Sequence, residues 1–143
     1  MIGFDICRIL SYDSLAYKNL TGLFHMNELP STVETHKFLI VFDSNHWGVV
    51  HCNLLKQLEL FDPLGQNSPL SKKVTKHFKT EQTFTSNKTQ LQSNESTLCG
   101  EYAIYYICMR FYDDGINYIE FLKLYFSTNQ EKIRNELKNL LKN

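Results

Sequence analysis

The spacing of apolar and polar residues predicts several short strands in the first half of the chain. The run KFLIVF from Lys37 is apolar, rich in β-branched and aromatic residues, and followed by turn-forming residues. The runs WGVVHC from Trp47 and QLELF from Gln57 have the same character, and Pro63 ends the second. We expect these last two runs to pair as an antiparallel hairpin.

Helical signals dominate the second half. Ser68 followed by Pro69 is a typical helix start, which predicts a lysine-rich helix to about Phe78. Apolar residues then recur at helical spacing from Cys99 to Asp113, before Gly115. This second segment is predicted to be the buried central helix.

Five further patterns complete the expected secondary structure. They predict a short N-terminal helix over Ser14 to Leu20, a strand near Gln82 to Thr85, a polar loop over Ser86 to Thr97, a helix over Asn117 to Phe126, and a final helix from Thr128 through Leu140. The predicted fold class is therefore α+β, with a small antiparallel sheet packed against a central helix and flanking helices.

Length and composition suit one domain. The 143 residues are 43% hydrophobic, which is enough for a single core, so we expect residues 1–143 to form one domain. Lys and Arg total 15 and Asp and Glu total 15, so the charge pattern favours neither nucleic acid nor an anionic membrane as a partner. We also expect a monomer.

The cysteines and the N-terminal segment indicate a reducing compartment. The four cysteines form no C-x-x-C pair, and residues 1–14 lack the layout of a secretory signal. The longest apolar stretch, around Ala103 to Cys108, is too short to span a bilayer. We therefore expect a soluble protein with free thiols that is not secreted.

Cys99 stands where a nucleophilic thiol would be expected. It lies between the polar loop and the apolar helix, so its sulfur would sit at a helix N-terminus, where a thiolate is stabilised. Gly100 beside it lets a substrate approach the main chain closely. The alternative interpretation is a buried helix cysteine, which is what we expect of Cys108.

His46 is the best candidate for the base, since it begins a strand directly after a turn. If three residues close the following hairpin, so that Cys52 faces Lys56, His46 lies directly opposite Asp62 on one face of the sheet. A connection of even length would instead pair Asp62 with Trp47.

These residues resemble a known family. His46-Trp47, the segment LFDPLG around Asp62, and Gln92 seven positions before Cys99-Gly100 resemble the adenovirus-type maturation proteases and, more distantly, the SUMO-specific proteases. Proteases of virophages and Polinton-like elements look most similar. The chain is shorter than the adenoviral enzymes and carries Asp where they carry Glu.

The resemblance implies a role for each residue. Cys99 would be the nucleophile, His46 the base, Asp62 the group that orients it, and Gln92 a donor to the oxyanion. Gly100 would border the substrate, and so would Trp47, which is otherwise most simply explained as a core aromatic residue. Substrates would be viral capsid or core precursors, cut in the virion or the virus factory of the host cell. The sequence calls for no cofactor and no metal, and an activating peptide or DNA is a hypothesis carried by the resemblance alone.

Other interpretations are open at this point. A ubiquitin-like or SUMO-like deconjugating protease would use the same four residues, and a non-catalytic binding module could keep the same fold. Asp62 could be an ordinary turn residue and Gln92 an ordinary loop residue. The lysines between Lys72 and Lys79 are best explained as a solvated helix face, with nucleic-acid contact as the weaker hypothesis.

Overall fold

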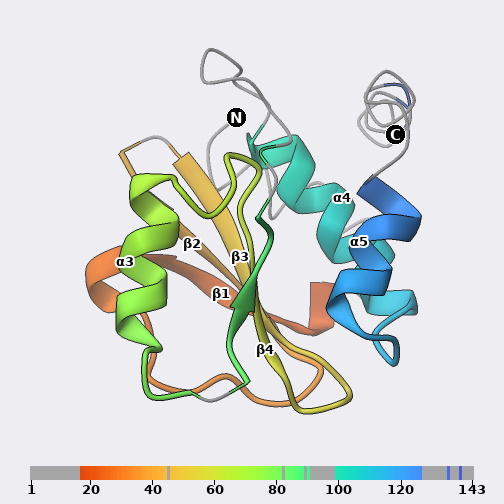
Figure 1. Ribbon diagram of the computed structural model, residues 1–143, viewed down its shortest axis with the longest axis horizontal. Coiled ribbons are helices and arrows are strands. Elements are labelled where there is room, and N and C mark those ends of the chain that lie inside the picture. Colours follow the sequence, from red (N-terminus) through yellow and green to blue (C-terminus); the bar gives the residue numbers. More distant parts are fainter. Residues whose placement is uncertain are drawn as a thin grey trace.

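The computed structural model describes residues 17–44, 46–81, 83–88, 90, 99–126, 135 and 139, and gives residues 99–101 as main chain alone. These residues form an α+β fold with one five-stranded sheet and helices on both of its faces (Figure 1). No helix in these ranges is long and apolar enough to cross a bilayer.

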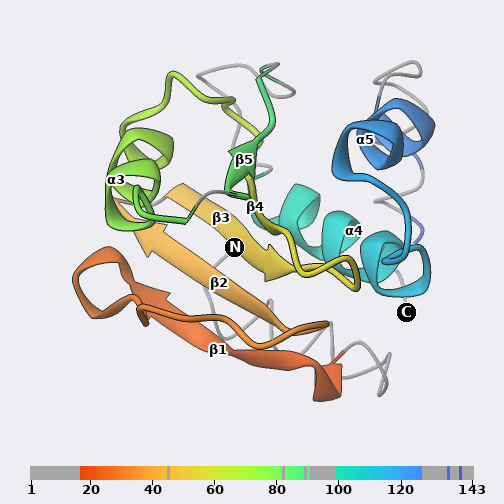
Figure 2. The same ribbon diagram turned by 60° about the horizontal axis from the view of Figure 1, so that its bottom comes forward.

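The sheet is mixed, so the prediction of an antiparallel sheet was wrong in part. The strands lie side by side in chain order: β1 Leu20–His25, β2 Phe38–Asp43, β3 His46–Cys52, β4 Leu58–Phe61 and β5 Thr85–Ser86. The pairs β2–β3 and β3–β4 are antiparallel, but the outer strands β1 and β5 each run parallel to their neighbour. Parallel pairing needs a long connection, and the segments before β2 and before β5 supply it (Figure 2).

Three α-helices confirm the strongest helical predictions. They are α3 Pro69–His77, α4 Cys99–Tyr112 and α5 Tyr118–Phe126, and a short 3-10 helix η1 covers Met26–Glu28. Ser68 caps α3 as predicted, since its hydroxyl accepts the Ser71 N–H at 3.0 Å.

The sheet separates two apolar layers. Alternate residues of a strand point to opposite faces, so Val50 and Cys52 pack with Leu70 and Val74 on the α3 side. The intervening residues, with Val49 among them, pack against α4 and α5. Both faces are covered, which is why the central strands are apolar at nearly every position.

Some predicted boundaries were wrong. Leu20 begins β1 rather than ending a helix, and the strand expected near Gln82 to Thr85 is the short β5 at Thr85–Ser86. The segment predicted as the last helix lies outside the described residues apart from Asn135 and Asn139, which are helical. Most of the predicted polar loop lies outside them too.

The hairpin between β3 and β4 is longer than predicted. Cys52 pairs with Leu58, so five residues connect the strands rather than three. The Asn53 side chain closes this loop, because its Oδ1 accepts the main-chain N–H groups of Leu55 at 2.9 Å and Gln57 at 3.0 Å.

Candidate active site

His46 is the first residue of β3. It pairs with Asp43, the last residue of β2, across a two-residue connection in which Ser44 has a positive φ of 48°. The tight connection places the histidine at the end of the sheet, with its side chain 15% exposed. His46 is therefore held in a paired strand and is still accessible to solvent.

Asp62 follows directly on β4 and contacts this histidine. Its side chain is fully buried, and its Oδ1 lies 2.5 Å from His46 Nε2. The structure thus brings together the two residues that the sequence paired.

The register that produces the contact differs from the predicted one. Continued by one residue, the β3–β4 pairing places Asp62 opposite Gly48, two positions from His46. A shift of two keeps the face the same, so the side chains meet along a diagonal. A Cβ on Gly48 would lie 3.2 Å from the Phe61 carbonyl oxygen and 3.3 Å from Leu70 Cδ2, so glycine keeps this part of the sheet closely packed.

Hydrogen-bond donors surround the Asp62 carboxylate. The Leu64 N–H donates to Oδ1 at 2.9 Å, while the hydroxyls of Ser68 and Ser71 donate to Oδ2, that of Ser71 at 2.7 Å. The amino end of α3 lies at the same oxygen, and the helix dipole favours a negative charge there. Together these donors hold the carboxylate in one orientation.

The main chain of Asp62 is fixed as well. The Asn87 side chain accepts the Asp62 N–H and donates to the Asp62 carbonyl, both at 2.7 Å. The Gly65 N–H donates to the same carbonyl at 2.8 Å, and Gly65 has a φ of 82°, which glycine adopts without strain. The sequence predicted Ser68 only as a helix cap, and nothing in it indicated the roles of Ser71 and Asn87.

Trp47 lies in the core, which confirms its simplest interpretation from the sequence. It is 8% exposed and packs against Phe42 with ring centroids 4.8 Å apart.

The remaining predicted residues are placed less fully. Cys99 and Gly100 are the first two residues of α4, and this end of the helix lies at the end of the sheet where β3 begins (Figure 1). The Cys99 side chain, Gln92 and Cys7 lie outside the described residues. Cys52 and Cys108 are both buried, as predicted for Cys108, and burial raises the pKa of the Cys52 thiol.

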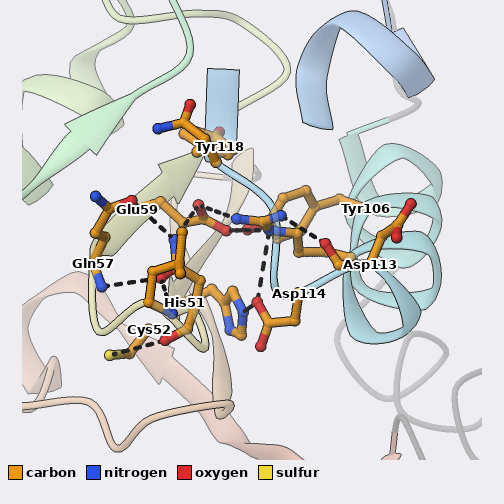
Figure 3. Close-up of polar contacts among 12 residues, drawn as sticks. His51, Cys52, Gln57, Glu59, Tyr106, Asp113, Asp114 and Tyr118 are labelled. Atoms are coloured by element: carbon orange, nitrogen blue, oxygen red, sulfur yellow. Dashed lines mark hydrogen bonds and ion pairs between the residues drawn. The ribbon is translucent and has the colours of Figure 1, made fainter. Parts of the chain in front are cut away.

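A second polar cluster, which the sequence did not reveal, lies on the opposite face of the sheet. His51 Nε2 lies 2.5 Å from Asp114 Oδ1, and His36 Nδ1 lies 2.5 Å from Asp114 Oδ2. Arg110 donates to both oxygens of Glu59. Figure 3 shows His51 and Asp114 pointing toward each other, with Glu59 and Tyr106 close by.

Three members of this cluster have the chemistry of metal ligands. One ligand atom each from His51, Glu59 and Asp114 lies within 4.8 Å of the others. A dication does not fit well, because the buried Arg110 guanidinium already lies 2.8 Å from Glu59 and 3.7 Å from Asp114. We interpret the cluster as an ion network that ties the sheet to α4.

The pKa shifts agree with this interpretation. Burial alone would raise the pKa of Asp114, but His51, His36 and Arg110 outweigh it and hold that pKa below its ordinary value. Burial lowers and Glu59 raises the pKa of Arg110, with a net increase, so the guanidinium keeps its charge. Burial, followed by the charge of Glu59, raises the pKa of Tyr106 well above its ordinary value.

Comparison with known proteins identifies no family. No protein-family model matches the chain, and no curated protein matches it. Function must be inferred from the residues and their geometry.

Proposed function

We propose that this chain is a cysteine endopeptidase that processes viral capsid or core precursors, with Cys99 as nucleophile and His46 as base. The observation that carries the proposal is the 2.5 Å contact between His46 Nε2 and the buried Asp62 carboxylate. A histidine held in this way by a carboxylate, and still partly exposed, is the usual partner of a catalytic nucleophile.

The geometry assigns the ring nitrogens. Because Asp62 engages Nε2, proton exchange with the thiol falls to Nδ1. Cys99 begins the 14-residue helix α4, whose N-terminal N–H groups and dipole favour a thiolate. Transfer of the thiol proton to His46 would then give a thiolate and an imidazolium, and Asp62 would stabilise the second.

The proposed reaction is acyl transfer in two steps. The thiolate attacks the scissile carbonyl, and the resulting oxyanion accepts hydrogen bonds from the Cys99 N–H and the Gln92 amide. His46 gives its proton to the leaving amine as the C–N bond breaks. His46 then takes a proton from water, whose oxygen attacks the thioester, and returns that proton to the sulfur as the acid product leaves.

The substrate class comes from the resemblance to the adenovirus-type proteases. The α+β fold, with His46 at the start of β3, Asp62 directly after the adjacent β4 and Cys99 at the start of α4, is compatible with that family. An activating peptide or DNA strand, and residence in the virion, would follow from membership of it.

Thiol reactivity is the first test. The native chain is treated with iodoacetamide at about pH 6, where an ordinary thiol is largely protonated, and the labelled peptides are counted by mass spectrometry. Cys99 should react at least about tenfold faster than Cys52 and Cys108, and His46→Ala should abolish that advantage. Equal rates at the three cysteines would refute the assignment of the nucleophile.

Cleavage is the second test. Wild type and Cys99→Ala are incubated with virion precursor proteins, and cut sites are identified by mass spectrometry. Wild type alone should cut. Cleavage only of ubiquitin-like or SUMO-like conjugates would replace the viral substrate with a deconjugation reaction at the same site.

A further inference from the structure

Asp62 can orient His46 only if the carboxylate itself cannot turn. Its Oδ1 faces His46 and the Leu64 N–H, and its Oδ2 faces the hydroxyls of Ser68 and Ser71. A partial twist about the bond to the carboxylate carbon would turn both oxygens away from their partners. The groups on Oδ2, together with the Leu64 N–H on Oδ1, therefore keep the carboxylate in the orientation that contacts the histidine.

The two serines are not equivalent. The Ser71 hydroxyl has two acceptors within reach, Asp62 Oδ2 at 2.7 Å and the Gly65 carbonyl at 2.9 Å, and one proton to give. The Ser68 hydroxyl accepts the Ser71 N–H at 3.0 Å, which directs its own proton to Asp62. Ser68 is thus the hydroxyl committed to the carboxylate.

We propose that Ser68 is a positioning residue of the active site, which acts on His46 by fixing Asp62. The inference rests on the proposed function. Ser68 is 6% exposed and is also the N-cap of α3, so one side chain joins the helix start to the carboxylate. Asn87 holds the main chain of Asp62 from the other side.

Neighbouring groups on β2, α3 and α5 have partners of their own. Asp43, opposite His46 in the sheet, is engaged by Lys73 of α3 at 2.5 Å. On the α5 side, the buried Tyr118 phenol donates to the Leu60 carbonyl at 2.7 Å. These groups stay unchanged when Ser68 is replaced, so an altered His46 titration reports on Asp62.

The decisive variant is Ser68→Gly. Glycine is nearly as good a helix N-cap as serine, so α3 is preserved while the hydroxyl is lost. Ser68→Thr restores the hydroxyl, and Thr75→Ala removes an exposed hydroxyl from the same helix as a control. Circular dichroism and urea unfolding confirm that all three variants are folded.

The readout is the pH midpoint of His46 deprotonation, followed by NMR of the ring protons, together with kcat and KM on a cleaved precursor. A carboxylate free to turn stabilises the imidazolium less, so Ser68→Gly should move the midpoint to lower pH. It should also reduce kcat by about tenfold at unchanged KM, with Ser68→Thr near wild type.

Two outcomes overturn the inference. A midpoint that is unchanged in Ser68→Gly would show that the Asp62 carboxylate keeps its orientation without the Ser68 hydroxyl. A midpoint that rises would show that removal of the Ser68 hydroxyl only strengthens the hydrogen bond that the Asp62 carboxylate accepts from His46. Failure of the proposed function is recognised separately, because rapid alkylation of Cys99 would then be missing in wild type itself.

Discussion

Two buried carboxylates in this chain accept a histidine at the same distance, yet their surroundings suit different roles. Asp62 contacts His46 and Asp114 contacts His51, each at 2.5 Å. The two histidines are five positions apart in one strand and point to opposite faces of the sheet. His46 is partly exposed, whereas the His51 side chain is fully buried, so only the first can meet a substrate.

The pair His46→Leu and His51→Leu separates these roles. His51 Nδ1 also faces the Lys37 carbonyl at 2.8 Å, and the ring stacks on Phe38 with centroids 3.8 Å apart. Its loss removes the buried histidine partner of the Asp114 charge and leaves His36 and Arg110 beside it, and should lower the free energy of unfolding by about 3 kcal/mol. His46→Leu should cost about 1 kcal/mol, because Asp62 keeps three other donors.

Urea unfolding measures the stability loss of each variant. Alkylation of Cys99 should rank the two variants in the opposite order. His46→Leu should eliminate the rapid reaction, while the folded fraction of His51→Leu should retain it. Equal stability losses, or loss of rapid alkylation in both variants, would contradict the assignment of a catalytic role to His46 and a structural role to His51.

At the scale of elements, the sequence predicted β2, β3, β4 and the three α-helices, because each has a strong local pattern. It did not predict β1 as a strand. The β1 residues LTGLFH are mostly half-buried and contain Gly22 beside a register irregularity, so their apolar alternation is weak. Parallel pairing with β2 depends on contacts distant in sequence, which no local pattern records.

The β3–β4 register illustrates the same limit. The hairpin itself was evident from alternating residues, but its loop length depends on the Asn53 side chain bonding the N–H groups of Leu55 and Gln57. Lys56 adds a positive φ of 62°. The same loop sequence is compatible with several turn conformations, so the predicted register was wrong by two residues.

Asn53→Ala tests whether this side chain sets the loop. Removing it leaves the Leu55 and Gln57 N–H groups without that acceptor, which should lower the free energy of unfolding by about 2 kcal/mol in urea denaturation. Leu55→Ala in the same loop is the control, since Leu55 is 50% exposed and should cost under about 0.5 kcal/mol. Similar costs for both would mean that the loop is held by other contacts.

Arg110 links α4 to the sheet. Its Nε donates to Glu59 Oε1 at 2.8 Å and its Nη1 to the Asp113 carbonyl at 2.8 Å, and it is fully buried. Arg110→Met would fill similar space but leave the Glu59 charge buried and uncompensated. We expect a loss of about 3 to 5 kcal/mol by chemical denaturation.

Lys123→Met in α5 is the matched control. Lys123 lies 3.6 Å from Glu120, with both side chains more than half exposed, and such pairs contribute under about 0.5 kcal/mol. If Arg110→Met were as mild as this control, the buried cluster would not join helix and sheet as inferred.

For the molecule as a whole, the sheet places the His46–Asp62 pair and the ion network on opposite faces. The sequence paired His46 with Asp62 on condition that three residues close the hairpin; the observed loop has five, and this odd length keeps the two side chains on one face. The sequence could not indicate that Asn87, 25 positions after Asp62, would hold its main chain, or that Asp114 would meet His51 from 63 positions away. Those contacts depend on where connections and helices lie.

The ion network should make the whole fold sensitive to acid. The pKa of Asp114 is lowered in the folded chain, so at a pH just below its ordinary value near 3.8 the unfolded chain binds a proton that the folded chain does not. Acid therefore favours unfolding there. The stabilisation from Asp114 is fully present above its ordinary pKa and is lost as pH falls through the lowered value.

Asp114→Asn should remove this contribution. The variant should be less stable than wild type at neutral pH, and its unfolding midpoint in urea should fall less steeply between about pH 5 and pH 2. Asp43→Asn is the control: Lys73 also lowers the pKa of Asp43, but this pair is at the surface, so salt and water screen it and the pH profile should change little. Parallel pH profiles for wild type and Asp114→Asn would show that the network does not govern acid unfolding, whereas convergence of the two curves in acid would place the stabilising charge at Asp114.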